Sequence, residues 1–349
     1  VGLGSKIITS DRNVRPVKRV QTRRNARVVL ISALSLDDID EDDDRLNYVS
    51  PLSTRYASRI MRATFSDLTR FRIWRQLWIS LAETQVELGM QGVTSEQVEA
   101  LKSAPDVDIE LAVTYERKLR HDVMSHVHAF GDQVPSARGI IHLGATSCYI
   151  TDNSELLQMR KGLEILIQSL WQSVANLAKF CKEYKDMPTL AYTHFQPAQP
   201  TSVGKRASLW LQDFVTDALE LEDVMNGLKA RGVKGTTGTQ ASFLSLFDGD
   251  HTKVRELDQR VTEKLGFRAG AWSVTGQTYP RKQDFRVVAA LAGIGQSAAK
   301  MANDVRLLQH MKELEEPFEK SQIGSSAMAY KRNPMRCERI NGLARFLQT

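Results

Sequence analysis

The sequence predicts an all-α fold: an elongated bundle of long helices with a smaller helical domain ahead of it. Three long stretches carry apolar residues three and four apart, the period of an amphipathic helix. They run from about 151 to 185, from 202 to 227 and from 281 to 311. No strand pattern separates them, and helices of this length bury their apolar stripes against one another.

Shorter helices are expected before the bundle. The stretch 65–88 repeats apolar residues at helical spacing. Thr94 and Gln97 offer a capping box for a second, short helix. A third helix is expected from 110 to 130, and a glycine-rich loop follows at 139–147.

The ends of the bundle helices carry their own signals. Thr151-Asp152-Asn153 can cap the first long helix. A fourth helix begins near Pro334 and is still running at Thr349. Because the chain ends inside a helix, we expect the bundle to be incomplete and a C-terminal helical domain to be absent.

These patterns divide the chain into three parts. Residues 1–44 form a tail with eight basic residues, mostly early, and eight acidic residues, mostly late. Such charge blocks favour a disordered, solvated tail, although a basic start can also resemble a mitochondrial transit peptide. An N-terminal helical domain is expected over 45–146 and a central helical-bundle domain over 147–349.

The composition excludes several classes of protein. Apolar residues make up 42% of the chain and charged residues 25%, which is ordinary for a globular protein. No window holds eighteen uninterrupted apolar residues, so no membrane span or membrane partner is predicted. The three cysteines lie far apart, which argues against disulfides and zinc fingers and favours the cytoplasm.

The net charge of +6 lies in the folded part, because the tail sums to zero. A basic protein can bind nucleic acid or small polyanions. The sequence has no helix-turn-helix, finger or aromatic ribonucleoprotein pattern. A small polyanionic ligand is therefore the favoured partner, and no nucleic acid is expected.

Three polar loops could carry chemistry: 192–201, 232–240 and 321–336. The last sets two serines, a tyrosine, a lysine and an asparagine close together, a set that can hold or react with an anion. An ordinary polar surface loop is the alternative for each. The segment 232–240 lacks the spacing of a P-loop, and its glycines instead allow close backbone approach.

His194 is the strongest acid–base candidate, because histidine titrates near neutral pH and Thr193 could orient it. A loop histidine can equally be structural. His121, His126 and His128 do not make a metal site, since helical spacing turns His126 away and no carboxylate completes a zinc pattern. No metal and no cofactor are expected.

Three ordered motifs carry a family resemblance. They are Thr-His-Phe-Gln-Pro-Ala-Gln at 193–199, Lys-Gly-Thr-Thr-Gly-Thr-Gln at 234–240 and Gly-Ser-Ser-Ala-Met-Ala-Tyr-Lys-Arg-Asn-Pro at 324–334. Together they resemble the fumarase/aspartase superfamily and, within it, the adenylosuccinate lyase family of the animal type. The likeness covers about 48–349.

The resemblance implies a C–N lyase of purine nucleotide biosynthesis. Such an enzyme releases fumarate by β-elimination from adenylosuccinate, leaving AMP, and from SAICAR, leaving AICAR. The carbanion formed beside a carboxylate needs positive charge and amide donors in place, and the departing nitrogen needs a proton. A homotetramer with active sites shared among three subunits is implied as well.

The matched motif positions imply roles for individual residues. Ser325 would be the general base, kept deprotonated by Lys331 and loop amides, and His194 the general acid. His121 would support the acid and contact the substrate, while Lys331 and Asn333 would hold a substrate carboxylate. The remaining matched positions would contact the substrate: Arg55 and Tyr56 at the nucleotide phosphate, and Arg120, Asp122, Thr146, Ser147, Thr193, Gln277, Ser326 and Arg339.

Two departures from the family pattern qualify this interpretation. Ala329 stands where the family has proline, which predicts weaker closure of the loop around Ser325. The chain also stops soon after the last motif. The alternatives are a catalytically silent chain that only binds other subunits, or another lyase of the superfamily such as argininosuccinate lyase.

Overall fold

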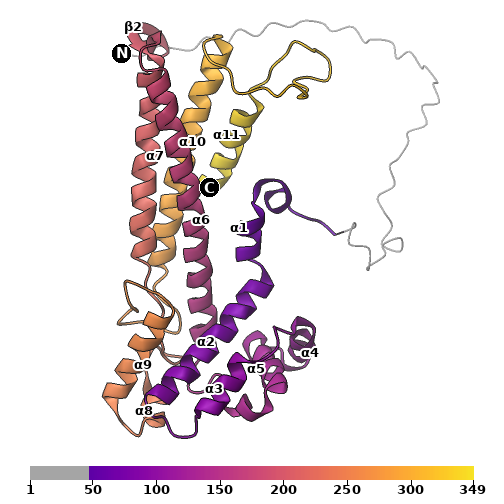
Figure 1. Ribbon diagram of the computed structural model, residues 1–349, viewed down its shortest axis with the longest axis vertical. Coiled ribbons are helices and arrows are strands. Elements are labelled where there is room, and N and C mark those ends of the chain that lie inside the picture. The colour runs from indigo at the N-terminus through magenta and orange to yellow at the C-terminus, as the bar shows by residue number, and fades with distance from the viewer. Residues whose placement is uncertain (1–46) are drawn as a thin grey trace, which may run out of the picture. The chain divides into compact units, whose positions relative to one another are not determined.

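The computed structural model describes residues 47–349 and divides the chain into two compact units, Val1–Tyr56 and Ala57–Thr349 (Figure 1). The described part of the first unit contains one π-helical turn, η3, Leu52–Tyr56. The predicted tail at 1–44 lies outside the described residues. The domain boundary expected at residue 146 remains a prediction.

The second unit begins with short helices, and two predictions about them are confirmed. The apolar stripe expected at 65–88 forms the buried face of α2. Thr94 makes the expected capping box with Gln97 at the start of α3. The elements of this region are α1 Arg59–Thr64, α2 Asp67–Glu87, α3 Ser95–Lys102, α4 Ile109–Leu119, α5 Asp122–Gln133 and the 3₁₀ helix η4 Pro135–Ile140.

The single helix expected at 110–130 was wrong, because the structure has two helices there. Arg120 ends α4 in the left-handed conformation, with φ 55°. His121 is the N-cap of α5, and its Nδ1 accepts a hydrogen bond from Met124 N at 3.4 Å. Basic residues close α4 and Asp122 opens α5, which suits the dipoles of two separate helices.

The loop leading into the bundle is fixed by α2. Trp78 Nε1 donates to His142 Nδ1 at 3.0 Å, and Gln85 Nε2 donates to Leu143 O at 3.2 Å. Burial lowers the pKa of His142 to about 4, so its ring is neutral and can accept the bond. This contact sets the position of Thr146 and Ser147 at the start of the next helix.

The long helices of the bundle are confirmed. α6 and α7 lie side by side, α10 packs on α7, and α11 packs on α10 (Figure 1). Leu163 and Ile167 of α6, Leu221 of α7 and Val287 of α10 share one apolar cluster. The bounds are α6 Ser147–Glu183, α7 Val203–Asn226, α10 Lys282–His310 and α11 Met335–Gln348.

The expected cap at Thr151-Asp152-Asn153 was wrong, since α6 starts at Ser147 and has Thr146 as its N-cap residue. Asp152 and Asn153 are buried inside the helix. Asp152 Oδ2 accepts from Tyr279 N at 3.0 Å, and Asn153 Oδ1 accepts from Arg231 N at 2.9 Å. The two polar side chains hold the segment between α7 and α10 against α6.

The loop expected at 192–201 belongs to an antiparallel hairpin, β1 Pro188–Thr193 and β2 Gln196–Ser202. His194 and Phe195 form its turn with φ values of 49° and 58°. Both central residues of a type I′ turn need positive φ, a place where Asn-Gly is usual. The hairpin was not predicted, because its turn lacks the usual Asn-Gly and because the prolines of β2 are unfavourable in a strand.

Two further helices, α8 Ala241–Leu246 and α9 His251–Lys264, were also not predicted. Asp250 caps α9 by accepting from Thr252 N and Lys253 N. The apolar face of α9 joins the core of α2. In the described part of the chain, no helix has both the length and the apolar character needed to cross a membrane.

Gly204 permits the close start of α7 against the end of α6. A Cβ there would lie 2.3 Å from Cys181 O and 2.7 Å from Lys185 N, both backbone atoms. Gly204→Ala is therefore expected to lower the free energy of unfolding by about 1–3 kcal/mol in urea titrations.

Gly342→Ala is the matched control, because α11 has open space at that position. It is expected to stabilise the fold by about 0.5–1 kcal/mol through helix propensity. Equal unfolding midpoints for the two variants would contradict this account of the α6–α7 junction.

Candidate functional site

The predicted site residues of the second unit, apart from Arg339, fall into two groups, one at each end of α6. The "hairpin end" holds the β1–β2 hairpin and the segment 311–334. The "α5 end" holds the α4–α5 junction, the start of α6 and the loops between α7 and α10 (Figure 1).

At the hairpin end, the turn places His194 at the tip of the hairpin, exposed beside Thr193. Tyr192 and Phe195 of the hairpin line a cavity of about 300 Å³ with residues of α7 and α10. Phe195 is itself 63% exposed, which is high for so large an apolar ring. The tip thus presents an imidazole next to an apolar surface.

The segment 311–334 folds Ser325 into a tight turn. Ser325 Oγ accepts from Ala327 N at 3.3 Å and from Met328 N at 3.2 Å. Two amide donors on one oxygen favour negative charge on it, as a serine acting as a base requires. In the described structure the Lys331 ammonium makes no hydrogen bond to Ser325. Of the two groups expected to stabilise the Ser325 alkoxide, the loop amides contact its oxygen and Lys331 does not.

Asn333 and Gly324 close the base of this loop. Asn333 Nδ2 donates to Gly324 O at 2.9 Å. A Cβ at Gly324 would lie 1.9 Å from Lys331 O, so the two arms of the loop meet only because residue 324 is glycine. Asn333 therefore has a structural contact in addition to the substrate contact expected of it.

At the α5 end, five predicted residues converge on the start of α6. His121 Nε2 and Ser147 Oγ lie 3.5 Å apart, and His121 Nδ1 lies 3.6 Å from Asp122 Oδ1. Arg120 is exposed beside them, and Thr146 is buried as the N-cap residue of α6. The unpaired amides and the dipole at this end of a long helix favour an anionic group.

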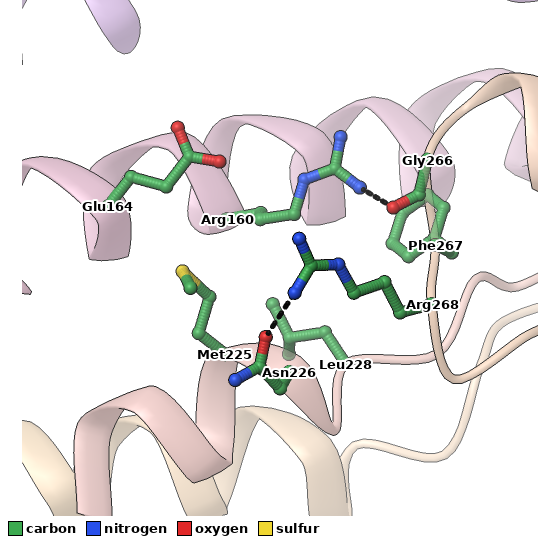
Figure 2. Close-up of a pocket in the computed structure, with 8 residues that line it drawn as sticks. All are labelled: Arg160, Glu164, Met225, Asn226, Leu228, Gly266, Phe267 and Arg268. Atoms are coloured by element: carbon green, nitrogen blue, oxygen red, sulfur yellow. Dashed lines mark hydrogen bonds between the residues drawn. The ribbon is translucent and has the colours of Figure 1, made fainter. Parts of the chain in front are cut away.

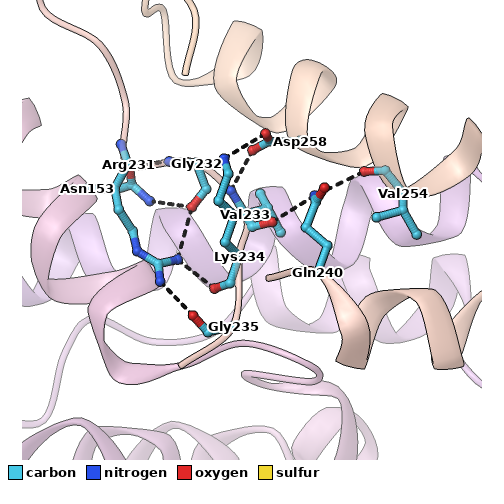
Figure 3. A network of polar contacts seen from close by, with 9 residues as sticks. All are labelled: Asn153, Arg231, Gly232, Val233, Lys234, Gly235, Gln240, Val254 and Asp258. Carbon is cyan, nitrogen blue, oxygen red and sulfur yellow. Dashed lines mark hydrogen bonds and ion pairs between the residues drawn. The ribbon is translucent and has the colours of Figure 1, made fainter. Parts of the chain in front are cut away.

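The Gly/Thr loop at the same end is organised by a buried cation (Figure 3). Arg231 is fully buried. Its guanidinium donates to Lys234 O, to Gly235 O at 2.8 Å and to Gln277 O at 2.9 Å. One side chain thereby fixes both the Gly/Thr loop and the backbone of Gln277, a predicted substrate contact.

Lys234, the first residue of that motif, is not free to bind a ligand. Its ammonium pairs with Asp258 Oδ2 at 3.0 Å, and Asp258 Oδ1 accepts from Val233 N at 2.6 Å (Figure 3). The Lys234 side chain is 5% exposed. The exposed residues of the loop are Thr236, Thr237 and Thr239.

Three predicted contacts lie apart from these groups. Arg339 is exposed on α11. Arg55 and Tyr56 end the π-helical turn of the first unit, and both are exposed.

The two groups cannot meet within the second unit. α6 has 37 residues, and an α-helix rises 1.5 Å per residue, so its ends lie about 55 Å apart. His121 contacts the first residue of α6, while the hairpin with His194 follows its last turn (Figure 1). A site that uses both histidines needs them from different copies of the chain.

A separate hollow of about 250 Å³ lies between α6, the end of α7 and the loop 266–268 (Figure 2). Arg160 and Arg268 line it, but Arg160 already donates to Gly266 O and Leu265 O. None of the predicted site residues lines it. Residues 47–349 contain no cluster of three or more His, Cys, Asp or Glu side chains that could hold a metal ion.

Sequence reasoning missed the residues that support the site. Arg231 directly precedes the Gly/Thr loop, but its role could not be predicted, because its partners are backbone carbonyls, which leave no trace in sequence. Glu313 lies in an acidic run that resembles a solvated surface, yet its carboxylate contacts the hairpin. Only the spatial arrangement reveals either role.

Comparison with known proteins supplies the family. A family model described as "Lyase" matches residues 64–347. The chain belongs to the lyase family. The match includes both ends of α6 and all three motifs, so the two groups of residues lie within the part that defines the family.

Individual relatives agree with this membership. The chain is 56% identical over 304 residues to the adenylosuccinate lyase of Saccharomyces cerevisiae, covering 86% of this chain and 63% of that protein. It is 50% identical over 308 residues to the adenylosuccinate lyase of Schizosaccharomyces pombe, covering 87% and 64%. The chain thus spans less than two thirds of the length of these relatives.

A solved structure shows the same fold. The fumarate lyase from Mesorhizobium sp. BNC1 superposes with a TM-score of 0.70 at 24% identity, covering 84% of this chain and 64% of that one. This likeness confirms the predicted helical-bundle fold.

Arg231→Lys tests the support of the Gly/Thr loop. A lysine cannot reproduce the guanidinium fork, so buried carbonyls lose their donors, and the free energy of unfolding is expected to fall by about 2–5 kcal/mol. Arg260→Lys is the matched control, because its ion pair with Glu256 is exposed, and a change of less than about 0.5 kcal/mol is expected. Similar losses in the two variants would contradict the role of Arg231.

Proposed function

We propose that this lyase-family chain functions as an adenylosuccinate lyase. The observation that carries the proposal is its 56% identity to the yeast enzyme over 304 residues, a span that includes most of the described structure. The reaction is the β-elimination of fumarate from adenylosuccinate, which leaves AMP, and from SAICAR, which leaves AICAR. The pathway is purine nucleotide biosynthesis, in the cytoplasm.

The reaction needs a general base that removes a proton from carbon and a general acid that protonates the departing nitrogen. Ser325, as an alkoxide, takes the proton from the carbon beside the substrate carboxylate. The C–N bond then breaks, its electron pair stays on nitrogen, and His194 gives that nitrogen a proton. The two amides at Ser325 Oγ support this assignment of the base, since they stabilise its anionic form.

The start of α6 binds the substrate in this proposal. His121 and Ser147 lie in contact there, at the positive end of the helix dipole. His121 contacts the substrate and supports the acid, and Lys331 with Asn333 holds a carboxylate. No metal or cofactor takes part. The other substrate contacts are Arg55, Tyr56, Arg120, Asp122, Thr146, Thr193, Gln277, Ser326 and Arg339.

The site is completed between copies of the chain, in a homotetramer. The length of α6 supports this assembly, because His121 of one copy can reach His194 only if that residue comes from another copy. Antiparallel association of the long helices would bring an α5 end beside a hairpin end. A nucleotide with one phosphate and two carboxylates suits the excess positive charge of the chain.

The direct test is turnover of adenylosuccinate by the purified chain, followed by its absorbance and by release of fumarate. Ser325→Ala and His194→Gln are each expected to lower kcat about 10²- to 10⁴-fold, the usual contribution of general acid–base groups.

Ser321→Ala and His251→Gln are matched controls, because both residues are exposed and neither is a proposed catalytic or substrate-binding residue. They are expected to keep full activity. Fumarate release that is unchanged in Ser325→Ala and His194→Gln, or absent from the unmodified chain, would contradict the proposal.

A further inference from the structure

Glu313 occupies a junction that the proposed mechanism does not explain. It lies three residues after the end of α10, next to Lys312, which turns the backbone with a φ of 62°. Its Oε1 accepts from the hydroxyl of Tyr192 at 3.0 Å, and its Oε2 accepts from Thr189 Oγ1 at 3.2 Å. Both donors belong to β1, the strand that leads to His194.

Arg206 of α7 completes the cluster. Its Nη1 donates to Glu313 Oε2 at 3.1 Å, and its Nη2 donates to Thr189 Oγ1 at 3.3 Å and to Leu190 O. The Arg206 and Glu313 side chains are 16% and 24% exposed. One carboxylate thus joins the hairpin, α7 and the end of α10.

The hydrogen bonds around Glu313 favour the ionised form of its carboxyl group. Burial raises the pKa of its carboxyl, but the hydrogen bonds from Tyr192, Arg206 and Thr189 outweigh burial and leave the pKa below its ordinary value. The carboxylate is therefore ionised at neutral pH, and its bonds to the hairpin are charge-assisted.

The segment just beyond Glu313 anchors the serine loop. Glu316 caps α11 by accepting from Arg336 N at 3.0 Å and from Cys337 N at 3.1 Å. Gln309 links the two arms, since its Oε1 accepts from Glu316 N and its Nε2 donates to Arg332 O. The hairpin and the base of the serine loop are consequently fixed to one short stretch of chain.

The hairpin needs such an anchor. It is a two-stranded sheet with a register shift between Leu190 and Tyr192 and with prolines in β2. An isolated hairpin of this kind is marginally stable, so its own ladder does not fix the position of its tip. The contacts with Glu313 act on the side chains of β1 only a few residues from His194.

We propose that Glu313 is a positioning residue that holds the hairpin, and through it the imidazole of His194, where a proton can be delivered to the departing nitrogen. This inference rests on the proposed function of His194 as the general acid. Glu313 touches no substrate and acts only through the hairpin. A misplaced acid loses catalysis without losing much substrate binding.

Glu313→Gln is the test variant, because it keeps the size of the side chain while losing its charge. The amide of the new side chain could adopt either of two orientations. In one, its nitrogen would face the donors of Arg206 and Thr189; in the other, its oxygen would accept from them and the Tyr192 hydroxyl would lose its acceptor. We expect kcat to fall about 10- to 100-fold, with KM within about threefold of the starting protein.

The deciding measurement is a double-mutant cycle with His194→Gln. If Glu313 acts through His194, Glu313→Gln has no further effect on kcat in the His194→Gln background. An equal loss in both backgrounds would show a general structural role and overturn the inference. Glu315→Gln is the matched control, since its exposed pair with Arg332 makes little difference to stability, and it is expected to leave kcat unchanged.

Tyr192→Phe covers the case in which Glu313→Gln does not fold. It removes one hydroxyl bond to Oε1, and a two- to tenfold loss of kcat, absent in the His194→Gln background, is expected. Full kcat in both Glu313→Gln and Tyr192→Phe would overturn the inference while leaving the proposed function intact. Unchanged turnover in His194→Gln alone would instead contradict the proposed function.

Discussion

The length of α6 separates the two groups of candidate site residues in the second unit. Ser147 at its start contacts His121, and the hairpin that carries His194 follows its last turn. A rigid helix of 37 residues keeps these groups about 55 Å apart. The chain therefore offers two half-sites rather than one site, and any chemistry that needs both depends on association of copies.

Each half-site is held by a polar side chain whose own role is structural. Arg231 donates hydrogen bonds to several backbone carbonyls at the α5 end, and Glu313 accepts hydrogen bonds from several side chains at the hairpin end. In both places the proposed catalytic or binding groups lie on loops or turns, which a helical bundle does not position by itself. Charged groups with several hydrogen bonds supply that rigidity, because losing one partner leaves a partly buried charge unsatisfied.

The sequence predicted the long helices well, because their apolar stripes repeat at helical spacing over many turns. The sequence-based prediction failed where the backbone conformation of one or two residues ends or reverses an element. Arg120 breaks a continuous pattern by turning left-handed, and His194 with Phe195 makes a hairpin turn without the usual glycine. Family motifs indicated the candidate site residues. Glu313 and Arg231 could not be assigned from sequence, since their partners are backbone atoms or lie more than a hundred residues away.

If the proposed site forms between copies of this chain, two variants that each lack one histidine should restore activity when mixed, and subunit complementation measures this. His121→Gln and His194→Gln, each strongly impaired alone, would be mixed in equal amounts under conditions that allow subunits to exchange, and fumarate release would be measured. With random assembly of a symmetric oligomer, about a quarter of the sites receive both native histidines, so about a quarter of the activity should return. No recovery, in mixtures shown to contain mixed oligomers, would contradict a site shared between chains.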